Sequence, residues 1–275
     1  DAAGQVARYL DRVVYERALE LRASAATGEV VAAAMGFGDP TATKHTLDAF
    51  RSRSGLVNAA RIYGLDGALI AESGESDPAA AKGSAWFTSS VAPSAPAFVG
   101  APERSSDGVL RVRLAEGVES ATGVSGVMVV DLDWQALTAA ALKTVERTST
   151  DGTTVAAFVL DADGRIVAAS DPTHLFTSAF DDPALKEAIG AHAAGSITAD
   201  FRGTASLAGF APIQPSGNNP GIYTGFGDGK ASVLIVEPSR SAFAAATSLA
   251  NLLILVAFGV TIVVAWVARD RKSVV

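Results

Sequence analysis

The longest apolar stretch of the chain lies near its carboxyl end and predicts a transmembrane helix. No residue from 242 to 268 is charged, and basic side chains follow directly at Arg269, Arg271 and Lys272. A helix needs about 20 apolar residues to cross ~30 Å of hydrocarbon. Basic residues beside a span stay on the cytoplasmic side. We therefore expect residues 242–268 to span the membrane, with 269–275 beginning a cytoplasmic segment; the alternative is a buried core helix.

This topology places everything before about residue 242 outside the cytoplasm, on the periplasmic face of a cell inner membrane. A domain outside the cytoplasm must be exported, yet Asp1 opens directly into a helical pattern without a signal peptide. We therefore expect a longer protein in which another transmembrane helix precedes Asp1. The residues after the span are too few to form a cytoplasmic module, so we expect that end to continue as well.

The start of the chain has the periodicity of an amphipathic helix. Apolar residues recur about every 3.6 positions from residue 4 to 35, and glycine and proline follow over 36–40. We therefore expect residues 1–40 to form a long N-terminal helix. One apolar stripe on it exceeds what a single lobe needs to bury, which favours a homodimer. The stripe consists of Val6, Leu10, Val13 and Leu21.

Alternating strand patterns follow, and they occur twice. Residues 65–73 resemble residues 162–170, and both segments carry an Asp-Gly turn between apolar runs. Residues 126–131 resemble residues 232–237, and both are apolar strands that lead towards a helix. Two matched landmarks in the same order indicate two subdomains of one kind.

We therefore expect an α+β chain with two lobes. A distal lobe spans residues 41–132, a connecting helix spans 133–149, and a proximal lobe spans 150–241. Each lobe should be an antiparallel sheet with helices on one side, because the apolar face of such a sheet must be covered.

Composition excludes several classes of function. The 275-residue chain has a net charge of −7 and no cysteine, so it lacks the basic surface that nucleic acids require and any cysteine-ligated metal. His45, His174 and His192 have neither metal-ligand spacing nor a partner nucleophile. The glycine-rich residues 225–230 and the Asp-rich residues 161–164 fit hairpin turns better than phosphate or calcium loops. We therefore expect no enzyme activity and no cofactor.

At this point the chain resembles a known family. The fragments IYGLDGALIAES, AWF, GVSGVMVVDLDW, FVLDADGRIVAASD and VLIVEPSRSAF resemble the double Cache domain of bacterial transmembrane receptors. The resemblance implies two tandem PAS-like lobes, of which the membrane-distal one usually binds a small molecule. It also implies a cytoplasmic output module of the chemoreceptor or sensor-kinase type.

One branch of that family binds amino acids through an Arg-x-Trp-Tyr motif, a later Tyr and an Asp that ends the last distal strand. Trp86 and Asp131 match this pattern, and Phe87 and Phe98 stand at the two tyrosines. Ser84 occupies the position of the carboxylate-binding arginine. Aromatic walls around one acid suit a ligand with a cationic or donor-rich group, amine or amino-acid-like.

We also expect Tyr63 or Arg111 to contribute to this site. Other interpretations remain open for the same residues. The aromatic side chains could be core packing, and Asp131 could cap the next helix. Arg111 and Arg113 could form a solvated strand face, or one of them could replace the missing arginine.

Two functions therefore follow from the sequence. The first is an extracytoplasmic sensor that binds a small molecule and signals through the membrane helix. The second is a membrane-tethered structural or dimerisation module without its own ligand.

Overall fold

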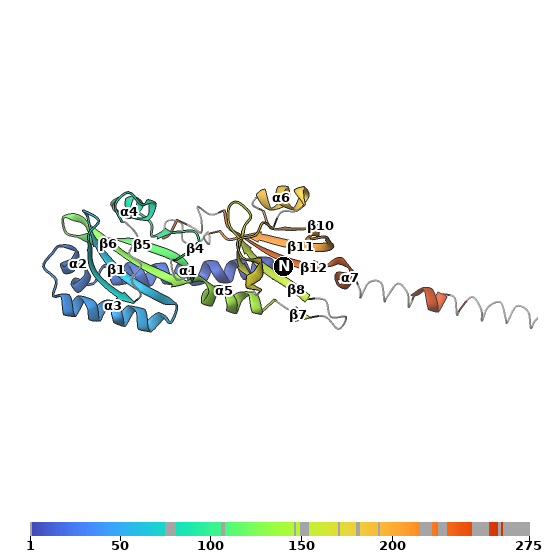
Figure 1. Ribbon diagram of the computed structural model, residues 1–275, viewed down its shortest axis with the longest axis horizontal. Helices are drawn as coiled ribbons and strands as arrows, with labels where there is room; N and C mark the ends of the chain where they lie inside the picture. The colour runs from blue at the N-terminus through green and yellow to red at the C-terminus, as the bar shows by residue number, and fades with distance from the viewer. Residues whose placement is uncertain are drawn as a thin grey trace, which may run out of the picture.

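The computed structural model has the α+β architecture expected from the sequence, with two antiparallel sheets arranged along one N-terminal helix (Figure 1). It describes residues 2–74, 81–105, 108–145, 147–148, 154–169, 171–179, 182–191, 193–214, 222–224, 230–243, 253–257 and 260. Most of the predicted transmembrane segment 242–268, and all of 269–275, lie outside these residues. Within the described part, no helix combines the length and apolar content that a membrane span requires.

The sheet of the distal lobe has the strand order β2-β1-β6-β5-β3, and β4 also pairs with β5. Its strands are β1 (Val57–Gly64), β2 (Leu69–Gly74), β3 (Phe98–Val99), β4 (Glu103–Arg104), β5 (Leu110–Ser120) and β6 (Gly123–Asp133). The helices of this half are α1 (Ala2–Ala25), α2 (Gly28–Ala34), α3 (Pro40–Ser54) and α4 (Ala85–Ser90).

The sheet of the proximal lobe has the order β10-β11-β12-β8-β7, and β9 also pairs with β8. Its strands are β7 (Arg147–Thr148), β8 (Thr154–Leu160), β9 (Ile166–Ala169), β10 (Gly195–Phe201), β11 (Thr204–Pro212) and β12 (Ser232–Pro238). Its helical elements are α5 (Trp134–Lys143), η1 (Pro172–His174), α6 (Pro183–Gly190) and α7 (Ser239–Ala242).

The two sheets repeat one arrangement, as the matched segments predict. β1 and β2 form an antiparallel hairpin beside β6, and β8 and β9 form the equivalent hairpin beside β12. Both hairpins turn on an Asp-Gly pair. The Asp66 carboxylate accepts the backbone N–H of Ala68 at 2.9 Å, and Asp161 accepts the backbone N–H of Arg165 at 2.9 Å.

The second of these turns settles one alternative. The Asp161 side chain bonds the backbone of its own turn, and Gly164 supplies the positive φ of 77° that the turn needs. No group of three or more His, Asp or Glu side chains among the described residues could hold a metal ion. The hydrogen bonds of Asp161 and the φ of Gly164 are those of a plain turn, the interpretation favoured for residues 161–164. Residues 225–229 of the glycine-rich loop lie outside the described part of the chain.

The single helix predicted for residues 4–35 is divided in two. α1 ends at Ala25, and Thr27 adopts an extended backbone with φ −70° and ψ 147° before α2 begins. The Thr27 hydroxyl donates to the Ser24 carbonyl at 2.8 Å. A side-chain hydrogen bond therefore satisfies a backbone carbonyl at the end of α1. The hydrophobic period continues across this break, which is why the sequence pattern did not show it.

The apolar stripe of α1 is buried inside its own chain. Leu10 and Leu21 have no exposed surface, Val6 is 3% exposed, and Val13 is partly buried. α1 packs against β5 of the distal lobe and against β11 and β12 of the proximal lobe, so one continuous core joins the helix to both sheets. The stripe therefore cannot supply the dimer interface predicted from it.

Candidate functional site

The two faces of the distal sheet have different roles. α1, α2 and α3 cover one face, where residues such as Ala60, Ile62 and Met128 join the main core. α4 lies on the opposite face (Figure 1). Because successive strand residues point to opposite sides, this second face receives Arg61 and Tyr63 of β1. The strand register places Arg113 of β5 and Asp131 of β6 on the same face.

An aromatic cluster lies under α4 on this second face. Tyr63, Trp86 and Phe87 are each at most 6% exposed and pack with small and branched residues of β5 and β6. The ring centroids of Tyr63 and Trp86 are 5.3 Å apart, and those of Trp86 and Phe87 are 5.7 Å apart, edge to face. Phe98 is partly buried and packs against the same cluster. Four of the six side chains predicted for the site are therefore in one place.

Local sequence positions α4 over the sheet. Ser84 caps the helix: its hydroxyl accepts the Phe87 backbone N–H at 3.4 Å and donates to the Ala81 carbonyl at 2.7 Å. Gly117 of β5 allows the end of α4 to approach, because a Cβ there would lie 2.5 Å from the Ser90 carbonyl oxygen. Ser84 thus orients Trp86 and Phe87 and does not substitute for the arginine of the family motif.

A row of alternating charges crosses the same face, one residue from each of four neighbouring strands. Glu72 of β2 lies 3.7 Å from the guanidinium of Arg61 on β1. Arg61 Nη1 donates to Asp131 Oδ2 at 2.7 Å, and Asp131 is 1% exposed. From β5, Arg113 donates through Nε to Asp131 Oδ1 at 2.8 Å and through Nη2 to Oδ2 at 3.2 Å. We call Glu72, Arg61, Asp131 and Arg113 the charged row.

The charged row meets the aromatic cluster at Arg113. Its guanidinium carbon lies 5.6 Å from the centroid of the Trp86 ring, within cation–π range. The Arg113 side chain is 22% exposed, whereas the side chains of Arg61 and Asp131 are each 1% exposed. Arg113 is therefore more accessible than Arg61 and Asp131, and within the row only Glu72, at 36%, is more exposed.

The ionisation of the row follows from its geometry. Burial is the largest influence on Asp131 and opposes its charge, but the hydrogen bonds and charges of Arg113 and Arg61 together hold the pKa of Asp131 below its ordinary value. Burial likewise opposes the charge of Arg113, and Asp131 outweighs it, so the pKa of Arg113 is raised. Burial raises the pKa of Tyr63, against the opposing charges of Arg61 and Arg113. At neutral pH Asp131 and Arg113 are therefore ionised and Tyr63 is neutral.

These contacts decide two of the alternatives left by the sequence. The cap of α5 is Asp133, whose carboxylate accepts the Ala136 backbone N–H at 2.9 Å, so Asp131 is not a helix cap. Arg111 is only 6% exposed, so the solvated-face interpretation is wrong for it. Arg111 precedes Arg113 by two residues on β5 and therefore lies on the same face, beside Asp133 in the strand register.

Sequence reasoning missed Arg61. The sequence did indicate it, because Arg61 lies between the apolar residues Ala60 and Ile62. It is also two residues from Tyr63, on the same face of the same strand. A charged residue flanked by apolar ones on a strand that is otherwise buried indicates a buried ion pair or a functional site.

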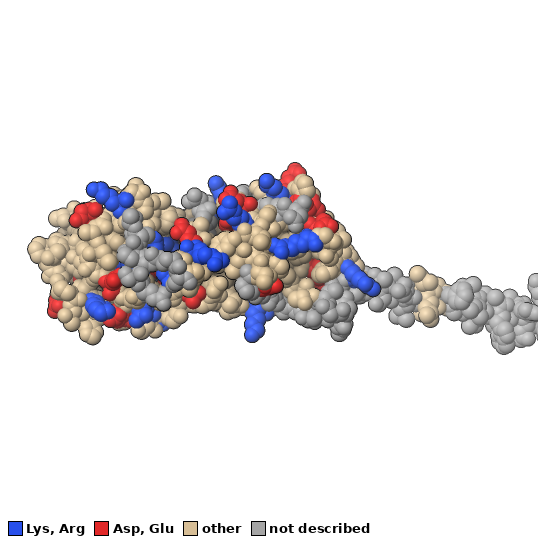
Figure 2. Space-filling view, viewed as in Figure 1, with Lys and Arg blue, Asp and Glu red and all other residues tan. Residues whose placement is uncertain are grey.

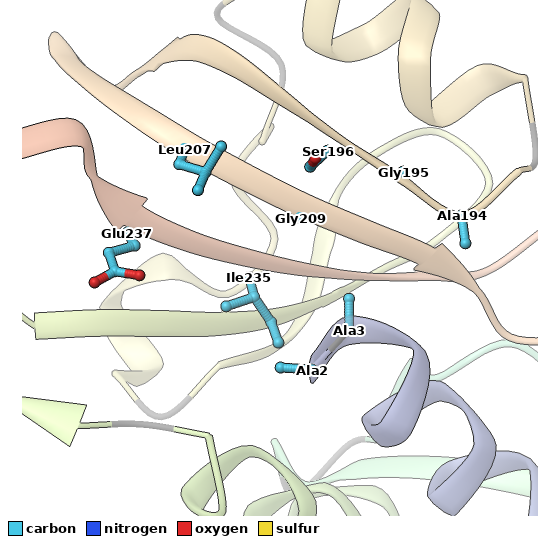
Figure 3. Close-up of a pocket in the computed structure, with 9 residues that line it drawn as sticks. All are labelled: Ala2, Ala3, Ala194, Gly195, Ser196, Leu207, Gly209, Ile235 and Glu237. Atoms are coloured by element: carbon cyan, nitrogen blue, oxygen red, sulfur yellow. The ribbon is translucent and has the colours of Figure 1, made fainter. Parts of the chain in front are cut away.

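A separate pocket lies in the proximal lobe, between the start of α1 and the sheet (Figure 3). Its volume is about 390 Å³. The lining is small and mostly apolar, and among the described residues that form it Glu237 is the one ionisable side chain. These residues are Ala2, Ala3, Ala194, Gly195, Ser196, Leu207, Gly209, Ile235 and Glu237. The pocket therefore lacks the converging polar groups that the distal face provides.

No family model and no curated protein sequence matches the chain. Several solved structures are similar to it. The ligand-binding domain of the Pseudomonas aeruginosa PAO1 amino acid chemoreceptor PctB, in complex with L-Arg, aligns with a TM-score of 0.59 at 15% identity, over 88% of this chain and 94% of that one. The ligand-binding domain of the Pseudomonas fluorescens chemoreceptor CtaA, in complex with L-alanine, gives 0.60 at 16% identity, over 88% and 96%.

An extracellular ligand binding receptor from Desulfohalobium retbaense gives a TM-score of 0.61 at 14% identity. The match covers 86% of this chain but only 39% of the receptor, so the chain spans about two-fifths of that protein's length. Identities this low compare folds and not functional residues. The chain therefore has the fold of these extracellular ligand-binding domains, with the two tandem PAS-like lobes that the resemblance to double Cache domains implies.

Proposed function

We propose that this chain is the extracytoplasmic ligand-sensing domain of a transmembrane signalling receptor of the chemoreceptor or sensor-kinase type. It binds a small molecule in the distal lobe, on the sheet face under α4. The observation that carries this proposal is the charged row ending at Arg113 against the aromatic cluster. The solved neighbours named for complexes with L-Arg, L-alanine and GABA have the same fold.

The site has the two components that a small-molecule site needs. Tyr63, Trp86, Phe87 and Phe98 offer apolar and aromatic walls. The charged row offers oriented polar groups held by backbone register. Burying two guanidiniums and a carboxylate is costly compared with apolar residues of similar volume. Such an arrangement is therefore more readily explained by recognition than by stability alone.

Contacts between the lobes offer a route from this site towards the membrane helix. A short segment of the proximal lobe, residues 222–224, pairs with the distal lobe around Phe98. The Ala97 N–H donates to the Ile222 carbonyl at 2.9 Å, and the Thr224 N–H donates to the Ala97 carbonyl at 3.0 Å. The Val99 N–H donates to the Thr224 hydroxyl at 3.1 Å. A ligand that shifts Phe98 would therefore act directly on the proximal lobe.

The second candidate function is a tethered structural or dimerisation module without a ligand. Its support in the sequence was the apolar stripe of α1, and that stripe is buried within the chain. The sensor proposal explains the charged row, whereas the module proposal leaves it unexplained.

A thermal-shift screen with a metabolite library tests the sensor proposal on the full chain. A ligand at 100 times its Kd stabilises the native state by about 2.7 kcal/mol. For a protein of this size each kcal/mol raises the melting temperature by roughly 2–4 °C. The matched variants are Trp86→Ala, within the site, and Phe37→Ala, whose ring is 81% exposed and distant in sequence from the site.

The expected result is a compound that stabilises the wild-type chain and Phe37→Ala equally and has little effect on Trp86→Ala. If the compound stabilises Trp86→Ala as much as the wild type, the ligand binds elsewhere. A complete library without any stabilising compound would favour the module.

A further inference from the structure

The charged row points to the chemical class of the ligand. We infer that the distal site selects a small organic carboxylate and that Arg113 binds its carboxylate group. This inference rests on the proposed sensing function. It differs from the sequence expectation, which was an amine or an amino acid held by Asp131.

Most of the hydrogen-bonding capacity of Asp131 is used by its own chain. A carboxylate has about four lone-pair sites, and three hydrogen bonds from two guanidiniums occupy Asp131. Its side chain is 1% exposed, so a ligand ammonium could reach it only by displacing an arginine. The displaced guanidinium would then be buried without its partner, which is unfavourable. Asp131 is therefore a positioning residue that orients Arg113.

Arg113 keeps donors available for a ligand. A guanidinium carries five N–H groups, and the two bonds to Asp131 use two of them, on Nε and on Nη2. Among the described residues, Arg113 Nη1 has no hydrogen-bond partner. The Trp86 ring packs against this guanidinium, with 5.6 Å between the ring centroid and Arg113 Cζ. A fixed, partly exposed fork of this kind matches the geometry of a carboxylate.

The two acids of the row are shared unevenly between its two arginines. Arg61 and Arg113 share the single charge of Asp131, and Glu72 approaches only Arg61, from the side away from Arg113. Glu103 of β4 is the other acid whose charge acts on Arg113, and it is exposed on the rim, where solvent screens it. The row as a whole is neutral, and Arg113 is the cation with the weaker counter-charge, beside the aromatic cluster.

Surface charge does not provide this preference. On the face shown in Figure 2, basic and acidic side chains are interspersed over both lobes, and the whole chain carries −7. Neither this face nor the net charge favours an anion, so the inference rests on Arg113 itself. The aromatic cluster next to Arg113 adds a preference for an acid with an apolar or aromatic body.

Isothermal titration of the full chain with matched probes tests this inference. One set is 3-phenylpropanoate, L-phenylalanine and 2-phenylethylamine, and a smaller set is propanoate, L-alanine and ethylamine. In each set the first compound carries only a carboxylate, the second carries a carboxylate and an ammonium, and the third carries only an ammonium. We expect at least one carboxylate to bind, its amino acid to bind more weakly, and its amine not to bind.

Variants then assign the binding residue. Arg113→Gln should weaken carboxylate binding about 10- to 150-fold, the range for a lost hydrogen bond to a charged group. Arg53→Gln, on the exposed side of α3, is the matched control and should leave binding unchanged. If Arg113→Gln does not fold, Arg113→Lys serves instead, because it keeps the charge beside Asp131 and loses the fork.

Each opposite outcome has a distinct meaning. Tighter binding of an amine or amino acid than of its matched carboxylate, abolished by Trp86→Ala, would overturn the anion inference and leave the sensing site in place. Absence of binding by both carboxylates at 10 mM, on the order of the weakest useful affinities, would also overturn it. Carboxylate binding that survives both Arg113→Gln and Trp86→Ala would place the site elsewhere and overturn the proposed function as well.

Discussion

Tyr223 of the proximal lobe donates its phenolic hydrogen to the carboxylate of Asp11 on α1. Both side chains are buried, and 212 residues separate them in the sequence. Tyr223 belongs to the segment 222–224 that also pairs with the distal lobe beside Phe98. One short segment therefore contacts the N-terminal helix and both lobes.

Removing this hydroxyl should weaken the whole fold. Tyr223→Phe leaves a buried carboxylate with one donor fewer, which costs about 1–3 kcal/mol. The free energy of unfolding, measured by urea denaturation of the full chain, should fall by that amount. Tyr9→Phe is the control, because Tyr9 is 46% exposed on the same helix. Equal stability of the two variants would show that the Tyr223–Asp11 bond contributes nothing net.

Asp131→Asn should destabilise the protein in the absence of any ligand. The substitution removes the counter-charge of Arg113 and leaves Arg61 with Glu72 alone, and breaking a buried pair in this way costs about 3–5 kcal/mol. Asp66→Asn is the matched control, because Asp66 lies in an exposed turn and asparagine also suits such a turn. Thermal melting at pH 7 compares the two. An unchanged melting temperature for Asp131→Asn would show that the charged row does not stabilise the fold.

The same carboxylate gives a pH dependence of known sign. The pKa of folded Asp131 is below its unfolded value of about 3.9. Its contribution is therefore fully present above that unfolded value and is lost as the pH falls through the lower folded value. The stability difference between wild type and Asp131→Asn should be constant from pH 7 to 5 and should shrink below about pH 4. A difference that grows on acidification would contradict the assignment.

Leu10→Ala should act on stability and not on association. Leu10 is fully buried between α1 and the sheets, and such a truncation costs about 2–5 kcal/mol. The unfolding midpoint should fall by that amount, while light scattering should report the same oligomeric state as the wild type. Tyr9→Ala, on the exposed side of the same helix, is the control. Loss of association without loss of stability would show that the apolar stripe of α1 forms a dimer interface.

Single cysteines test the membrane topology expected from the sequence. The chain has no cysteine of its own, so each introduced thiol is the only one. Ser52→Cys, exposed on α3, should react with an impermeant maleimide on intact cells, whereas Ser273→Cys should react only after permeabilisation. Equal reaction of both thiols before permeabilisation would refute the topology.

The sequence alone determined the α+β class and the two lobes. These depend on local information, because strand alternation, helical period and Asp-Gly turns each involve a few neighbouring residues. The repeat of residues 65–73 at 162–170 was therefore sufficient to indicate two sheets of one kind. The motif positions Trp86 and Phe87 also came from the sequence, and the structure places both in one cluster.

Only the tertiary structure decided which groups meet at Asp131. Arg61 is 70 residues from Asp131 and Arg113 is 18 residues away, and their contact depends on the register of three strands. A shift of one residue would turn each side chain to the other face. The turn between β5 and β6 is local, but β1 and β6 are far apart in the sequence, and no local pattern shows that they pair. The same holds for the stripe of α1, since periodicity identifies an apolar face but not the surface that covers it.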